Sequence, residues 1–126
     1  MILEIAIENF RSIGAEQILS FCSTDSRGGN LGNVTALPGS QYRVAKSIAL
    51  YGANASGKTN ALRALWVVRM MIGSSYRLGE GESIPWYDPC LFYGENHTAG
   101  SRFEVEFIVP MGGVNTRFLY RSEERR

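Results

Sequence analysis

The sequence predicts an α/β fold in which antiparallel strands precede a strand–loop–helix unit and a β-hairpin follows it. Residues 2–7 and 17–22 are short apolar segments of strand-like composition, separated by turn-forming residues. Residues 44–51 are a buried-strand candidate that leads into a glycine-rich loop, and a helical pattern follows over 58–72. Residues 102–109 alternate apolar and polar side chains, which indicates a half-buried strand.

The first two strands are expected to pair as a hairpin, because residues 9–14 between them carry turn chemistry. The following stretch, 23–33, is rich in Ser, Thr, Asp, Gly and Asn and predicts a loop. Residues 33–37 are expected to form a short edge strand, which Pro38 and Gly39 close.

The helix predicted over 58–72 is apolar on nearly all sides, with Arg63 and Arg69 as its main polar residues. This pattern is typical of a helix that is buried in a core. Residues 76–101 are expected to be irregular. They carry an aromatic-rich segment with Trp86, Tyr87, Phe92 and Tyr93. For this segment, packing over a small core is favoured over binding a base or a partner.

The second hairpin is predicted from residues 102–109, a connection over 110–115 and a partner strand over 116–121. The alternation assigns one side of the first strand to the core, namely Phe103, Val105, Phe107 and Val109. The only histidine, His97, is interpreted as a surface loop residue and not as a metal ligand.

The length of 126 residues fits one domain, and 44% hydrophobic against 20% charged residues excludes a disordered chain. A net charge of +1 provides no basic surface for nucleic acid. No apolar run approaches the about twenty residues of a membrane span, and no signal peptide is recognisable. We therefore expect a cytoplasmic protein in which Cys22 and Cys90 are reduced, buried thiols.

Residues 52–59, Gly-Ala-Asn-Ala-Ser-Gly-Lys-Thr, fit the pattern G-x-x-x-x-G-K-[ST] of the Walker A loop. Its glycines let backbone N–H groups converge on phosphate oxygens, and the helix that follows adds its positive dipole end. Lys58, one of only two lysines, is expected to reach the β- and γ-phosphates. The hydroxyl of Thr59 is expected to bind Mg²⁺.

Two segments carry a resemblance to a known family: residues 8–12, Glu-Asn-Phe-Arg-Ser, and residues 49–62, which include the loop. They resemble the N-terminus of ABC-class, AAA-type ATP-binding proteins of the abortive-infection and phage-defence group. That group is related to OLD-family nucleases and to the ATPases of chromosome maintenance and recombination repair. Residues 103–107 and 118–120 are also similar to this group.

The resemblance implies a P-loop NTPase fold, an ABC-ATPase-like N-terminal lobe, with ATP and Mg²⁺ as cofactors. It also implies that residues 1–126 are a single partial nucleotide-binding domain of a longer ATPase. No apolar run ending in Asp-Glu and no Leu-Ser-Gly-Gly signature occurs in the sequence, so this chain alone is expected to bind nucleotide without hydrolysing it. The implied partners are a second ATPase head in a homodimer, a nuclease or other effector, and nucleic acid, with no membrane.

Arg11 lies in a turn that the resemblance places near the nucleotide. Two interpretations of Arg11 stay open: a contact with phosphate or ribose, or an ordinary surface arginine. For Asn60, completion of the first helical turn is favoured over a ligand role. Lys58 is the expected catalytic residue, and Thr59 is the expected metal ligand. The expected cofactor-binding residues are Gly52, Ala53, Asn54, Ala55, Ser56, Gly57, Lys58, Thr59, Asn60 and Arg11.

Two alternatives to an ATPase stay open. One is a non-catalytic nucleotide-binding or interaction module, which the missing Walker B acid favours. The other is a P-loop kinase or GTPase, in which the loop usually follows the first strand. The sequence holds no Asn-Lys-x-Asp guanine-recognition motif, which argues against a GTPase.

Overall fold

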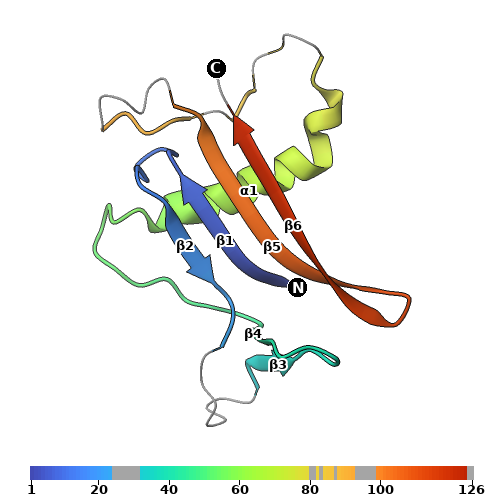
Figure 1. Ribbon diagram of the computed structural model, residues 1–126. Coiled ribbons are helices and arrows are strands. Elements are labelled where there is room, and N and C mark those ends of the chain that lie inside the picture. Colours follow the sequence, from blue (N-terminus) through green and yellow to red (C-terminus); the bar gives the residue numbers. More distant parts are fainter. Residues whose placement is uncertain (24–31, 80–81, 83, 87, 93–98, 125–126) are drawn as a thin grey trace.

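The computed structural model describes residues 1–23, 32–79, 82, 84–86, 88–92 and 99–124. It has an α/β architecture with antiparallel strands and one α-helix, as predicted (Figure 1). The elements are β1 (Ile2–Glu8), β2 (Gln17–Ser20), β3 (Val34–Ala36), β4 (Arg43–Ala45), α1 (Lys58–Ser74), a 3-10 turn (Ser75–Arg77), β5 (Ser101–Met111) and β6 (Val114–Glu124).

The main sheet has four antiparallel strands in the order β2-β1-β5-β6, and α1 crosses one of its faces (Figure 1). Both predicted hairpins are confirmed, β1 with β2 and β5 with β6. The second is longer than expected, because β5 and β6 continue to a two-residue turn at Gly112 and Gly113. β3 and β4 form a separate two-stranded ribbon below the sheet.

The main core lies between α1 and the sheet. Strand β1 places Ile5 and Ile7 on this face, because side chains of a strand alternate between its two sides. Phe103 of β5 is 1% exposed and packs edge-on against Phe10, with ring centroids 5.3 Å apart. The helix contributes its buried side: Ala64, Val67, Val68 and Met71.

A second, smaller core joins the sheet to the β3–β4 ribbon. It contains Leu3, Leu37, Val44 and Ile108. Ile108 is buried there and Val109 is 37% exposed, so the predicted burial of Val109 is wrong. The ribbon covers the end of the sheet and so buries the residue that strict alternation assigns to the outer side.

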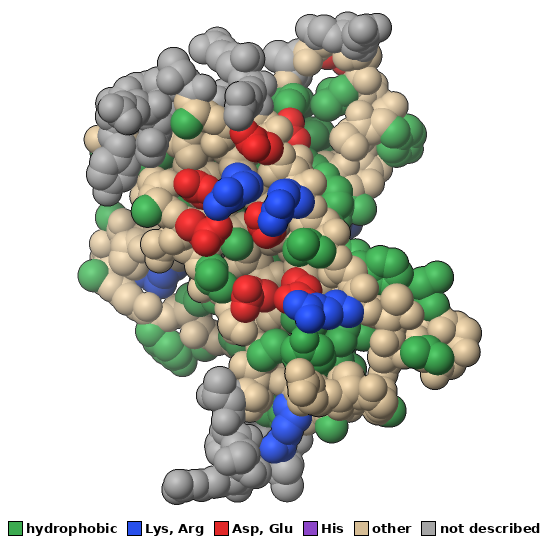
Figure 2. All heavy atoms as spheres, in the orientation of Figure 1, with side chains coloured by type: hydrophobic (Ala, Val, Ile, Leu, Met, Phe, Trp, Pro, Cys, Tyr) green, Lys and Arg blue, Asp and Glu red, His purple; other side chains and the backbone are tan. Residues whose placement is uncertain are grey.

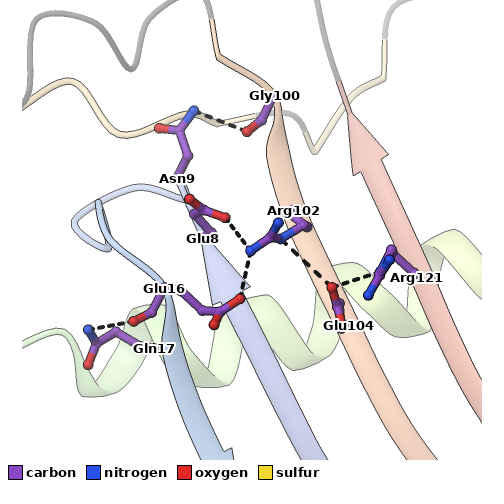
Figure 3. A network of polar contacts seen from close by, with 8 residues as sticks. All are labelled: Glu8, Asn9, Glu16, Gln17, Gly100, Arg102, Glu104 and Arg121. Atoms are coloured by element: carbon purple, nitrogen blue, oxygen red, sulfur yellow. Dashed lines mark hydrogen bonds and ion pairs between the residues drawn. The ribbon is translucent and has the colours of Figure 1, made fainter.

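The outer face of the sheet carries ion pairs. Figure 2 shows acidic and basic side chains gathered over the strands on the side away from α1. Arg102 lies at the centre of this network and contacts Glu8, Glu16 and Glu104, and Glu104 also pairs with Arg121 (Figure 3). The hydrogen bond that Arg102 donates to Glu16, together with the negative charge of Glu8, raises the pKa of the Arg102 guanidinium.

The strand predicted over 44–51 is wrong in its second half. β4 ends at Ala45, residues 47–51 adopt no strand, and Tyr51 is 91% exposed. A strand needs a hydrogen-bonded neighbour, and no strand in the described part of the chain pairs with 47–51. The segment instead runs as an extended connection from the ribbon to α1.

The helix begins at Lys58 as predicted, but its expected burial on nearly all sides is wrong. Leu62, Trp66 and Ile72 are each more than half exposed. A single sheet packs against α1, and one sheet covers only one face of a helix. The apolar residues of the opposite face therefore remain exposed.

The aromatic segment is described in part. Trp86 packs against the main core, as favoured for this segment, whereas Phe92 is 77% exposed. The remaining predictions for Tyr87, Tyr93 and His97 lie outside the described residues. Both cysteines are free thiols. Cys90 is buried as predicted, whereas Cys22 is only half-buried. No helix within the described residues is long and apolar enough to cross a membrane.

Candidate nucleotide-binding site

Residues 52–59 fold into a tight loop that ends at the start of α1. Gly57 is the N-cap of the helix and has φ +89°, a left-handed conformation that glycine adopts without steric cost. Gly52 allows a close approach, because a Cβ at this position would lie 2.8 Å from the Ser56 Oγ atom. Ala55, with φ +63°, is also left-handed. These angles curl the backbone around the Lys58 side chain.

The ammonium group of Lys58 lies inside this loop. Its Nζ atom donates hydrogen bonds to the carbonyl oxygens of Gly52 at 2.8 Å and Ala53 at 2.6 Å, and to Ser56 Oγ at 3.3 Å. An ammonium group has three N–H donors, so the loop uses all three. The positive charge is therefore held at the centre of the loop, beside exposed backbone carbonyl groups.

The start of α1 presents free donors to the same space. Within the described residues, no acceptor bonds the backbone N–H groups of Lys58 and Thr59, and no side chain caps the helix. The first turn also contains no acidic residue. Unbonded N–H groups at the positive end of a helix favour an anion.

A cleft of about 430 Å³ lies between the loop and the turn that follows β1. Ser12, Gln17 and Tyr51 line it together with Ser56 and Lys58. Of the described residues that line the cleft, only Lys58 carries a charge. The electrostatic character of the cleft is therefore positive, and the opposite wall supplies hydroxyl and amide groups.

The predicted site residues separate into two groups. Gly52 to Thr59 come together in the loop, and Thr59 is exposed at the first helical turn. Arg11 does not line the cleft at the loop. It lines a neighbouring cleft and pairs with Asp88, and its Nε atom donates to Asn60 Oδ1 at 3.1 Å.

Asn60 completes the first helical turn, as favoured, because its backbone N–H bonds the Gly57 carbonyl at 2.9 Å. Its side chain also donates to Ser12 Oγ at 2.6 Å. Sequence reasoning did not select Ser12 or Tyr51 as site residues. Ser12 adjoins Arg11 in the segment that carries the resemblance, and this position is the only sequence signal that pointed to it.

The loop fits the phosphate group that its sequence pattern implies. A Cβ at Gly52 would lie 2.8 Å from Ser56 Oγ, so a residue with a side chain would disturb the folded loop, and the unbonded N–H groups at the start of α1 are donors that a phosphate accepts. Thr59 is exposed at the first helical turn, and its hydroxyl oxygen is a ligand type that a hard cation such as Mg²⁺ accepts.

Comparison with known proteins identifies a family to which the chain is similar. Residues 47–125 match the model of a family described as "AAA domain, putative AbiEii toxin, Type IV TA system". The matched range contains the whole loop, α1 and the whole second hairpin. No curated protein and no solved structure matches the chain.

Proposed function

The chain belongs to this AAA domain family, and from that membership and the geometry of the loop we propose that it binds ATP with Mg²⁺ as part of a P-loop ATPase. One observation carries the proposal: the Lys58 ammonium and the free N–H groups of α1 converge in one loop. A triphosphate is the ligand whose charge and oxygen atoms match this set of donors.

Each part of the loop has a proposed role. Lys58 exchanges its carbonyl partners in the loop for β- and γ-phosphate oxygens, and the backbone from Gly52 to Gly57 surrounds the phosphates. Thr59 holds Mg²⁺, which offsets negative charge on the phosphates when bound. Ser12 and the turn after β1 form the wall of the cleft toward the ribose and base. In this proposal Arg11 and Asn60 hold the wall in place, because Asn60 contacts both Arg11 and Ser12.

At a finer level, we propose that the chain is the N-terminal lobe of an ABC-type ATPase head, related to the OLD-family and chromosome-maintenance ATPases. Hydrolysis then requires a Walker B acid, which the sequence of this chain does not contain. Two heads would enclose ATP between them and drive a nuclease, another effector or an activity on nucleic acid. The family description, which names a toxin of a type IV toxin–antitoxin system, supports a role in phage defence.

Calorimetric titration of the chain with Mg-ATP, Mg-GTP and inorganic phosphate tests the binding proposal. We expect saturable binding of Mg-ATP that outcompetes inorganic phosphate, because the triphosphate engages the loop and the cleft wall together. Binding of Mg-GTP alone would favour the GTPase alternative, and no binding of either nucleotide would refute the proposal. Phosphate release measured on a chain that includes a Walker B acid separates an ATPase from a non-catalytic module.

A further inference from the structure

The turn between β1 and β2 is tied to a distant segment of the chain. Asn9 and Arg11 both have positive φ, at +50° and +56°, which is an uncommon backbone conformation for residues other than glycine. The backbone N–H of Arg11 bonds the Asp88 carbonyl at 2.8 Å, and the two side chains form an ion pair. The Cys90 N–H bonds Asn9 Oδ1 at 3.0 Å. Residues 88–90 therefore hold the turn in this conformation.

From Arg11, side-chain contacts continue to the phosphate-binding loop. Arg11 Nε donates to Asn60 Oδ1 at 3.1 Å, and Asn60 Nδ2 donates to Ser12 Oγ at 2.6 Å. Ser12 Oγ in turn lies 3.5 Å from the position of a Cβ on Gly57. Three side chains, those of Arg11, Asn60 and Ser12, therefore connect Asp88 to the N-cap of α1.

The direction of each hydrogen bond is fixed by chemistry. A guanidinium group only donates, so Arg11 must face the oxygen of the Asn60 amide. The amide nitrogen of Asn60 then faces Ser12, whose hydroxyl oxygen accepts. The hydroxyl proton of Ser12 is left to donate elsewhere, and Ser12 lines the cleft at the loop. Through the Asn60 amide, Arg11 therefore leaves the Ser12 hydroxyl free to donate a hydrogen bond to an anionic or hydroxylated ligand.

We propose that Asp88 is a positioning residue for the nucleotide site: it holds Arg11, Arg11 orients the Asn60 amide, and Asn60 fixes Ser12 against the phosphate-binding loop. This inference rests on the proposed nucleotide binding and adds a residue that lies outside the cleft. Arg11 does not line the cleft at the loop, so in this proposal it acts through Asn60. It faces a separate cleft of about 420 Å³, which Trp66 and Trp86 also line.

We call the series of contacts from Asp88 through Arg11 and Asn60 to Ser12 the relay. The substitution Asp88→Asn distinguishes this relay from direct binding of the nucleotide by Arg11. If Arg11 touched the phosphates, removal of the neighbouring negative charge would strengthen Mg-ATP binding. In the relay, the same substitution loosens Arg11 and weakens binding. We expect the Kd of the full chain to rise roughly three- to tenfold, the effect of about one hydrogen bond. Asp88→Glu, which keeps the carboxylate, is expected to restore most of the affinity.

A double-mutant cycle tests whether Asp88 acts through Asn60. Asn60→Ala is expected to weaken Mg-ATP binding by a similar factor, and adding Asp88→Asn to it should cause little further loss. Glu104→Gln is the control, because it also removes a carboxylate from an ion pair with arginine, the Arg121 Nε–Glu104 Oε1 pair at 2.7 Å, and Glu104 lines neither of the two clefts. This control lies on the outer face of the sheet and should leave Kd unchanged.

Three results would overturn the relay: tighter binding by Asp88→Asn, unchanged binding, or losses that add fully in the double variant. Urea unfolding of each variant separates a local effect from loss of the fold, since the relay predicts affinity changes in chains that stay folded. Lys58→Ala serves as the reference. If it weakens binding while Asp88→Asn does not, the relay fails and the proposed function stands. If Lys58→Ala has no effect, the proposed function itself fails.

Discussion

Lys58 is the residue on which the proposed function depends most directly, and Lys58→Ala is its strongest single test. The ammonium group makes three hydrogen bonds inside the loop, at 2.8, 2.6 and 3.3 Å. In the proposed complex these are exchanged for charge-assisted bonds to phosphate oxygens. Such bonds contribute about 1.5–3 kcal/mol, so the variant should raise the Kd for Mg-ATP roughly 10- to 150-fold.

The fold should tolerate this substitution. The carbonyl groups that Lys58 leaves belong to Gly52 and Ala53, which are exposed, so water replaces the lost bonds. We expect the free energy of unfolding in urea to change by less than about 0.5 kcal/mol. Affinity and stability should therefore separate clearly in this variant.

The other lysine provides a matched control. Lys46 also donates from Nζ to an exposed backbone carbonyl, that of Gly32 at 3.1 Å, but it lies next to the β3–β4 ribbon. Isothermal titration should show Lys46→Ala binding Mg-ATP as the wild type does. The reasoning is refuted if Lys58→Ala keeps wild-type affinity, or if both variants lose affinity equally.

Three further predictions concern the metal, the loop backbone and the core. Thr59→Ala should weaken ATP binding more with Mg²⁺ than with EDTA; an equal loss would mean that the hydroxyl has a structural role. Gly57→Ala should weaken Mg-ATP binding, whereas Gly39→Ala, also at positive φ (+75°), should not, although each costs about 1–2 kcal/mol of stability. Phe103→Ala should lower the free energy of unfolding in urea by about 3–5 kcal/mol, against under about 0.5 kcal/mol for the exposed Leu119→Ala; similar values for both would contradict the assigned core.

The sequence by itself determined the elements whose patterns are local. Strand β1, both hairpins and the start of α1 at Lys58 followed from alternation, turn residues and the glycine that precedes the helix. The tight loop from Gly52 to Thr59 was also indicated by sequence, since its glycine spacing is local, and the structure places these residues together at the start of α1. These features depend on residues close together in the chain, so no tertiary information was needed.

Burial, in contrast, was decided by the tertiary structure. The composition of α1 predicts burial on nearly all sides, but burial depends on what packs against a helix, and one sheet covers one face. Residues 47–51 have the composition of a strand, yet a strand forms only beside a partner. Ile108 replaces Val109 in the core because the β3–β4 ribbon closes the end of the sheet.

The surroundings of the loop were likewise a tertiary result. Asp88, Arg11, Asn60 and Ser12 come from three separate segments, and their contacts span up to 77 positions in the chain. A motif records which residues bind a ligand directly, because its spacing is local. Which distant side chains hold them in place depends on how the segments pack, and this information appears only when the chain is folded.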